Sequence, residues 1–142
     1  MAINLEPLIT SADLQPVIPG YPFLFYDKVL AQTPDSLEML KNISVNEWQA
    51  QTGAPLPAWV ILEIMAQTAG ALGRALEPGT PYRHRLMARI RRARFRRPVA
   101  CGDQLKVKAR LLNAYRRSIA FGVRVQSEGA CIADAEFYFF RF

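Results

Sequence analysis

The sequence predicts an α+β domain in which an antiparallel six-stranded sheet wraps around one central helix. Three observations carry this prediction. Residues 58–76 are apolar almost throughout and contain no proline, which indicates one buried helix. Two strand-like runs precede this helix and four follow it. The connections between the last strands are short, which favours antiparallel neighbours.

The first two strands form a predicted hairpin. Residues 21–32 are rich in aromatic side chains and are bounded by turn residues. Residues 33–35 supply a turn, and residues 37–45 form the second strand, whose alternation slips near Asn42. Residues 1–20 contain three prolines and are predicted to form an N-terminal arm.

The helix is bounded by proline at both ends. Pro57 suits the first helical turn, while Pro78 and Gly79 stop the helix. Since the helix is apolar nearly all round, it needs cover on every side. Its own sheet covers one side, so we expect a second copy on the other.

Four strands are expected after the helix, at residues 85–98, 104–112, 119–125 and 130–142. The second of them alternates cleanly, with Lys106, Lys108 and Arg110 on its polar face. The last is predicted to place Ile132 on the face of Asp134, and Cys131 on the face of Ala133. This order of elements is that of a hotdog fold. We predict a single hotdog domain over residues 1–142 and at least a dimer.

The composition excludes some classes of function and favours others. The chain has 142 residues, a formal net charge of +6 and a sequence pI of about 9.7, so an acidic partner is expected. One histidine and two cysteines exclude a His-rich or Cys-rich metal cage and a disulfide framework. We expect no metal, no membrane span, no export signal and a cytoplasmic location.

Glu63 is the predicted catalytic residue. It lies in the second turn of the apolar helix, where an ionised carboxylate is costly unless it is paired or hydrogen-bonded. Gln67 follows one turn later on the same face and is predicted to orient that carboxylate or a bound water. Pairing of Glu63 with an arginine, or exposure at the helix start, is the alternative. Backbone N–H groups between Pro57 and Val60 are candidates for polarising a thioester carbonyl.

Four segments in register resemble a known family. They are residues 21–29 (YPFLFYDKV), 41–47 (KNISVNE), 61–70 (ILEIMAQTAG) and 93–105 (ARFRRPV, then GDQL). Together they are similar to the beta-hydroxyacyl-[acyl-carrier-protein] dehydratases of bacterial fatty-acid synthesis, from about residue 18 to residue 139. The resemblance implies a hotdog dimer that eliminates water from a 3-hydroxyacyl thioester carried on phosphopantetheine, with no further cofactor. It gives Glu63 the role of acid, and by analogy Ala58, Trp59 and Phe95 bind substrate.

The chain departs from that family before the first strand, where Pro19-Gly20 replaces the family's usual Pro-His, and again before the helix. The family's proton-abstracting histidine precedes the helix, but residues 47–57 are shorter here and contain no histidine. In this respect the stretch 56–60 (LPAWV) is more similar to dehydratase-like proteins of aryl-polyene and related pigment clusters, which act beside polyketide machinery. His84, the single histidine, lies between two arginines after the helix and is expected to be a surface residue.

An arginine-rich stretch is the candidate partner-binding surface. Its predicted carrier-binding residues are Arg91, Arg92, Arg94, Arg96 and Arg97. Acyl carrier proteins are strongly acidic, so a cationic strand face suits their docking. A merely solvated strand face is the alternative. Nucleic acid would satisfy the same electrostatics, but no stacking motif or recognition helix supports it, and we expect no nucleic-acid partner.

Three functional hypotheses stay open on the sequence. The first is an acyl-carrier-protein-linked dehydratase, whose base is an unrecognised group or Glu63 acting through water. The second is a thioesterase in which Glu63 activates water. The third is a catalytically silent subunit that binds acyl chains or completes a heterodimer with a homologous dehydratase. The first accounts for most of the features above.

Overall fold

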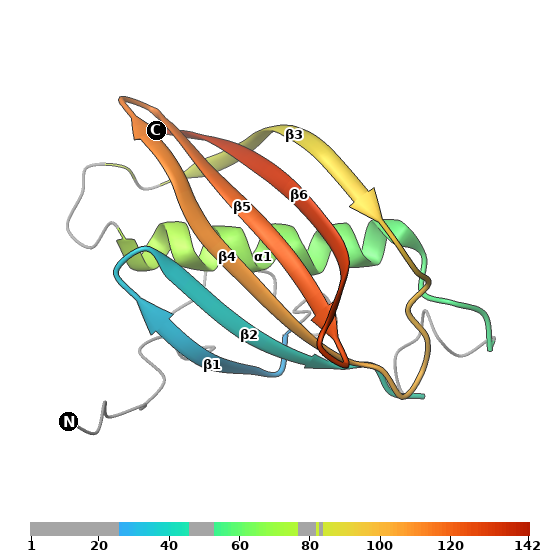
Figure 1. Ribbon diagram of the computed structural model, residues 1–142. Coiled ribbons are helices and arrows are strands. Elements are labelled where there is room, and N and C mark those ends of the chain that lie inside the picture. The colour runs from blue at the N-terminus through green and yellow to red at the C-terminus, as the bar shows by residue number, and fades with distance from the viewer. Residues whose placement is uncertain (1–25, 46–52, 77–81, 83) are drawn as a thin grey trace, which may run out of the picture.

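A six-stranded antiparallel sheet curves around one helix in the computed structural model (Figure 1). The structure describes residues 26–45, 53–76, 82 and 84–142. The strand order is β1-β2-β4-β5-β6-β3. The elements are β1 (Lys28–Thr33), β2 (Ser36–Asn42), α1 (Ala58–Leu76), β3 (Arg85–Phe95), β4 (Gln104–Tyr115), β5 (Ser118–Ser127) and β6 (Ala130–Arg141). The predicted α+β hotdog architecture is confirmed, while the arm 1–20 lies outside the described residues.

The helix occupies the bounds that the sequence predicts, Ala58–Leu76. Pro57 lies just before its first residue rather than within the first turn, and its carbonyl accepts a hydrogen bond of 3.0 Å from the N–H of Val60. At the other end, Arg85 of β3 donates from Nη2 to the carbonyl of Gly73 at 2.9 Å. A cation at that position satisfies a terminal carbonyl and complements the negative end of the helix dipole. The half-buried setting of Arg85 lowers its pKa through desolvation.

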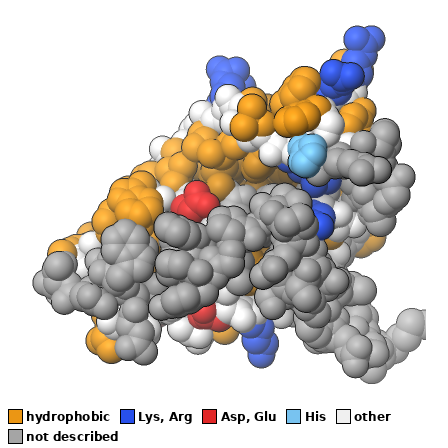
Figure 2. Space-filling model, turned by 180° about the vertical axis from the view of Figure 1, so that it is seen from behind, with side chains coloured by type: hydrophobic (Ala, Val, Ile, Leu, Met, Phe, Trp, Pro, Cys, Tyr) orange, Lys and Arg blue, Asp and Glu red, His pale blue; other side chains and the backbone are white. Residues whose placement is uncertain are grey.

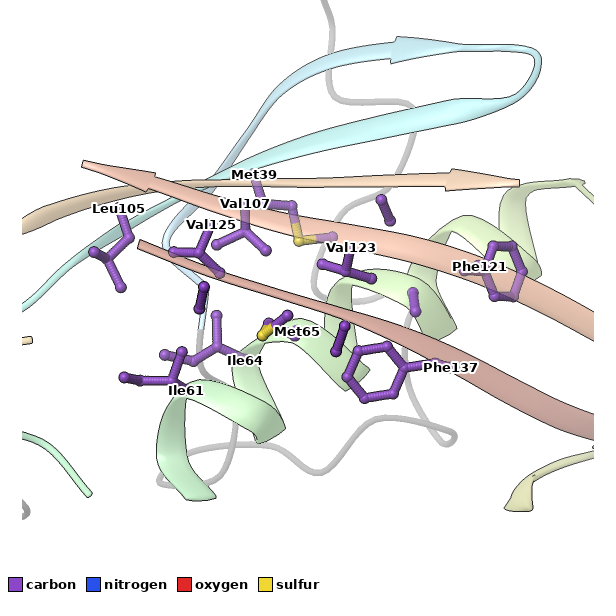
Figure 3. Packing of buried hydrophobic residues seen from close by; sticks show 14 of the residues in the cluster. Met39, Ile61, Ile64, Met65, Leu105, Val107, Phe121, Val123, Val125 and Phe137 are labelled. Atoms are coloured by element: carbon purple, nitrogen blue, oxygen red, sulfur yellow. The ribbon is translucent and has the colours of Figure 1, made fainter. Parts of the chain in front are cut away.

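The core fills the space between the helix and the inner face of the sheet (Figure 3). Along β5, Phe121, Val123 and Val125 point toward the helix, while the residues between them lie on the outer face. Ile64 and Met65 of α1 are buried against these side chains. Two-residue alternation in the strands and the apolar side of the helix therefore meet in one continuous core.

The last strand corrects one sequence prediction. Ile132 is only 2% exposed and belongs to the core, whereas Cys131 is half-buried opposite the outer-face residue Gln126. The cause is a register shift between Val125 and Gln126, where two residues of β6 face one step of β5. From Ala133 onward the predicted alternation holds.

β3 leaves one edge of the sheet unpaired within the described chain, since its neighbour in the sheet is β6. Three large apolar side chains on this strand are exposed: Leu86, Met87 and Phe95. Seen from behind the view of Figure 1, hydrophobic side chains gather next to the single histidine, with Lys and Arg side chains at the same margin (Figure 2). An unpaired edge with apolar side chains is a surface that natural proteins usually cover.

No helix among the described residues is long and apolar enough to cross a membrane.

Candidate active site

A hydrogen bond joins the two side chains that the sequence singles out on the helix. The amide Nε2 of Gln67 donates to Oε1 of Glu63 at 3.0 Å. Gln67 is buried and Glu63 is half-buried, so the amide is held in place while the carboxyl group keeps access to the surface. One turn of helix brings the pair together, because residues four apart lie on the same face. The predicted pairing of Glu63 with Gln67 is thus present, and Glu63 forms no ion pair with a described arginine.

The carboxyl group lies on the side of the helix that the sheet leaves uncovered. Trp59, Glu63, Ala66 and Gly70 follow the helical repeat along this side, and none of them is fully buried. Trp59 is 54% exposed. A Cβ added at Gly70 would meet no atom within 4 Å, so the surface beside the carboxyl group is open in the single chain. We call this row of four residues the open helix face.

A shallow pocket of about 250 Å³ opens at the start of the helix. Its lining residues are Leu56, Ala58, Ile61, Phe95, Arg96, Arg97 and Pro98. Two of the predicted substrate-binding residues, Ala58 and Phe95, are therefore brought together from distant parts of the chain. Its lining combines apolar side chains with two arginines, a composition that suits ligands with an apolar part and an anionic end.

The other predicted catalytic and substrate-binding residues do not line this pocket. Trp59 and Glu63 lie on the open helix face, whereas Ala58 and Ile61 turn toward β3 and the loop after it. Of the backbone groups predicted at the helix start, the N–H of Val60 donates to the carbonyl of Pro57 and is therefore not free to polarise a carbonyl. Within the described residues of one chain, the carboxyl group and the pocket are separate features on two sides of α1.

His84 lies far from Glu63. It is exposed, its backbone pairs with that of Phe142, and its ring centroid is 5.6 Å from the ring of Phe142. The next residue, Arg85, contacts the carbonyl of Gly73 near the C-terminal end of the helix. Glu63 is ten residues before Gly73, roughly 15 Å along the axis at the rise of an α-helix. This geometry agrees with the predicted surface position and separates His84 from the carboxyl group of its own chain.

The predicted carrier-binding arginines are partly neutralised by carboxylates. Arg92 pairs with Glu136 at 3.2 Å, Arg96 pairs with Asp134, and Arg97 pairs with Asp103 at 3.1 Å. The guanidinium of Arg97, together with the N–H of Ala100, lowers the pKa of Asp103, although partial desolvation opposes this. Arg91 and Arg94 are exposed and have no ion-pair partner among the residues described.

A second set of cations, not assigned by sequence reasoning, lies on the outer face of the sheet. Lys106, Lys108 and Arg110 of β4 and Arg124 of β5 line a groove of about 610 Å³. The alternation of β4 predicts a polar face, but only the fold shows that this face adjoins Arg92 and Arg94 of β3, and Arg96 just after it, in the same groove. We call this cavity the outer groove.

The fold places the chain in the hotdog class, and its central helix carries a half-buried carboxyl group at Glu63. The family model described as "ApeP-like: ApeP dehydratase" matches residues 14–141. The chain belongs to this family, and the dehydratase family resemblance predicted from four sequence segments is confirmed.

Curated relatives place the chain in the same group. It is 36% identical to the 3-hydroxyacyl-[acyl-carrier-protein] dehydratase FabZ of Neisseria meningitidis over 140 residues, covering 94% of each chain. It is 39% identical to the FabZ of a Shewanella species, strain W3-18-1, over 127 residues, covering 80% of each chain. Among solved structures, the dehydratase heterocomplex ApeI:P from Xenorhabdus doucetiae has a TM-score of 0.74 at 15% identity, covering 87% of this chain and 86% of that one. This likeness confirms the fold.

Proposed function

We propose that this chain acts in the dehydration of 3-hydroxyacyl thioesters carried on an acyl carrier protein, with Glu63 as the general acid. The observation that carries the proposal is the hydrogen bond from Gln67 Nε2 to Glu63 Oε1 on the open helix face. Family membership supports it, since the curated relatives are dehydratases of this substrate class. In this proposal Gln67 is a positioning residue, because it acts through the carboxyl group.

The hydrogen bond assigns different tasks to the two carboxyl oxygens. Oε1 accepts from Gln67, which leaves Oε2 without a hydrogen-bond partner among the described residues. A proton on Oε2 faces the open side and can be passed to the 3-hydroxyl group of the substrate. In the elimination, the C2–H bond breaks, its electron pair forms the C2–C3 double bond, and the C3–O bond breaks as the hydroxyl group leaves as water. General acid catalysis of such a departure contributes about 10²–10⁴ in rate.

The base that takes the C2 proton is proposed to come from a second chain. His84 is the only histidine of the sequence, and it lies at the opposite end of the helix from Glu63. The open helix face and the unpaired β3 edge are two surfaces on which a second chain would pack. A homologous dehydratase chain carrying the family histidine would complete the site there. The ApeI:P structure is described as a heterocomplex of dehydratases, which supports such an arrangement.

The pocket at the helix start is proposed to receive the apolar part of the substrate. Ala58 and Phe95 line it together with Arg96 and Arg97. Trp59, 54% exposed on the neighbouring side of the helix, is proposed to line the path between the pocket and Glu63 once a second chain covers it. The acyl carrier protein, the phosphopantetheine arm and a fatty-acid or aryl-polyene pathway follow from the same proposal. No further cofactor is needed for the chemistry described.

The test compares products from the wild type and Glu63→Gln. Each is incubated, alone and with a histidine-containing homologous dehydratase, with a 3-hydroxyacyl and a plain acyl carrier protein thioester, and the products are followed by mass spectrometry. We expect enoyl thioester from the wild type in the presence of the homologue, and a loss of at least about 100-fold in Glu63→Gln. Because the homologue has an active site of its own, its rate alone is the baseline. Free acid from the plain thioester would instead identify a thioesterase.

The variant Gln67→Ala tests the positioning role of the amide. We expect Gln67→Ala to lower kcat about tenfold and to shift the acidic limb of the pH profile, with KM little changed, because the substrate does not touch the amide. A loss of activity without any change of the pH profile would assign Gln67 a purely structural role.

A further inference from the structure

The outer groove carries more positive charge than its own carboxylates can neutralise. Seven cationic side chains line it: Arg92, Arg94, Arg96, Lys106, Lys108, Arg110 and Arg124. Three carboxylates, Glu38, Asp134 and Glu136, line it as well. The groove therefore has an excess of four positive charges over a volume of about 610 Å³. Such a concentration attracts an acidic partner.

The pairing pattern shows which cations are available. Glu136 is taken by Arg92 at 3.2 Å, and Asp134 is taken by Arg96. Among the described residues, no ion pair neutralises Lys106, Lys108, Arg110 or Arg124. The uncompensated charge of the groove thus lies mainly on β4 and β5, with a smaller contribution from Arg94 of β3.

The register places like charges next to each other. Lys108 lies directly opposite Arg124 across the β4–β5 ladder. Like charges at such a position destabilise a sheet. Glu38 of β2 lies opposite Lys108 and Asp134 of β6 lies opposite Arg124, but Asp134 binds Arg96, and neither carboxylate forms an ion pair with Lys108 or Arg124 in the described chain. This exposed pair of cations adds nothing to the core, and an anionic partner would offset its repulsion.

We infer that the outer groove docks an acidic protein surface, and that Lys106, Lys108, Arg110 and Arg124 supply the binding charge. Under the proposed function, on which the partner's identity rests, this protein is the carrier that presents the thioester. The inference moves most of the docking charge from the arginines predicted from the sequence, in β3 and just after it, to β4 and β5. Arg96 lines both the outer groove and the pocket at the helix start, so a protein seated in the groove adjoins that pocket.

The spacing of the cations favours a protein over a small anion. Lys106, Lys108 and Arg110 alternate along β4, roughly 7 Å apart from one to the next. All three are exposed, so they do not converge on one buried point as a phosphate site requires. A row of separate carboxylates on a protein surface fits this spacing.

Nucleic acid and a second copy of the chain fit less well. The groove has three carboxylates and no aromatic side chain in its lining, so it repels phosphates in part and offers no base a stacking surface. A second copy has the same formal net charge of +6 and would bring positive charge to a positive surface.

The test measures binding without turnover. Purified bacterial acyl carrier protein in its apo form is titrated into the wild type and into the double variant Lys108→Glu/Arg124→Glu, at low and at high salt. The matched control is Lys28→Glu/Arg117→Glu, which makes the same change of charge at two exposed positions outside the groove. We expect the groove variant to weaken binding at least about tenfold at low salt, and the control to stay within about twofold.

Equal weakening in both double variants, or none in the groove variant, would overturn the inference. Tighter wild-type binding to a single-stranded oligonucleotide, lost in the same variant, would overturn it in favour of nucleic acid. If the groove variant unfolds, Lys108→Gln/Arg124→Gln is used in its place, and a smaller loss of binding affinity is expected. Because the binding assay measures no reaction, its result can be interpreted even if the dehydration assay fails. Each proposal can therefore be contradicted without the other.

Discussion

The two faces of the sheet differ more than any other pair of regions in this molecule. On β5, Phe121, Val123 and Val125 are buried against the helix, while Gly122, Arg124 and Gln126 lie on the outer face. The inner face is explained by packing alone, since each side chain fills space in one core. Packing does not explain the outer face, because Lys108 and Arg124 lie opposite each other there and neither side chain fills space in the core. The contrast distinguishes residues that stabilise the fold from residues that packing does not explain and that are candidates for a function.

The largest expected change in stability comes from comparing the inner and outer faces of one strand. Phe137 of β6 is fully buried, whereas Phe140 of the same strand is 41% exposed. We expect Phe137→Ala to lower the free energy of unfolding by about 3–5 kcal/mol, because the core around it cannot collapse fully. Phe140→Ala should cost less than about 1 kcal/mol. Urea unfolding of both variants measures the difference, and equal costs would contradict the assignment of faces.

Two glycines make the same comparison on the helix. A Cβ at Gly73 would come within 3.1 Å of Cζ of Phe121 and 3.4 Å of Nε of Arg85, while a Cβ at Gly70 would meet nothing within 4 Å. Alanine is a better helix former than glycine by about 0.5–1 kcal/mol. We expect Gly70→Ala to gain that amount in the free energy of unfolding, and Gly73→Ala to gain none or to lose stability.

Gly70→Ala also probes the open helix face. If a second chain packs there, the added methyl group should weaken association even though it stabilises the helix. Analytical ultracentrifugation over a range of protein concentrations measures this association. If Gly70→Ala changes neither the self-association constant nor the association constant with the homologous dehydratase, the second chain does not pack on the open helix face.

The pair of Arg97 and Asp103 predicts a smaller, pH-dependent effect. Because Arg97 and the N–H of Ala100 lower the pKa of Asp103 in the folded chain, the ionised carboxylate stabilises the fold above its usual pKa of 3.8. That stability is lost as the pH falls through the lowered value. Asp103→Asn should therefore be less stable than the wild type at neutral pH, with the difference shrinking below about pH 4. Chemical unfolding at several pH values measures it, and a constant difference would contradict the cause given.

The smallest expected effect lies on the outer face. Replacing Arg124 by glutamine removes the like charge opposite Lys108 and keeps a polar side chain. We expect the free energy of unfolding to rise by roughly 0.2–0.5 kcal/mol at low salt, and the gain to fade as salt is added. A loss of stability instead would mean that Arg124 has a stabilising partner in the folded chain.

Local patterns in the sequence predict much of this fold. Proline before the helix and Pro78-Gly79 after it suffice to bound α1 at its observed residues, because both act through the backbone of the neighbouring positions. The Glu63–Gln67 pair is likewise local, since one helical turn determines its geometry.

Features that depend on distant neighbours are not predictable in this way. The bulge that moves Ile132 into the core arises from pairing with β5, and nothing in the sequence of β6 alone marks it. The neutralisation of Arg92 and Arg96 depends on Glu136 and Asp134, which lie some forty residues later in the chain. The outer groove has the same origin, because five strands contribute its cations and carboxylates only after the sheet has formed. The separation of Glu63 from the pocket at the helix start also follows from tertiary structure.

The most direct test of the central claim is the initial rate of enoyl formation from a short 3-hydroxyacyl pantetheine thioester. Wild type and Glu63→Gln are compared, each with the histidine-containing homologue, after subtraction of the homologue's own rate. A short substrate removes any contribution of carrier docking and leaves only the chemistry at the open helix face. The account predicts that Glu63→Gln loses at least about 100-fold in rate while its thermal unfolding matches the wild type. Full turnover by Glu63→Gln would contradict it.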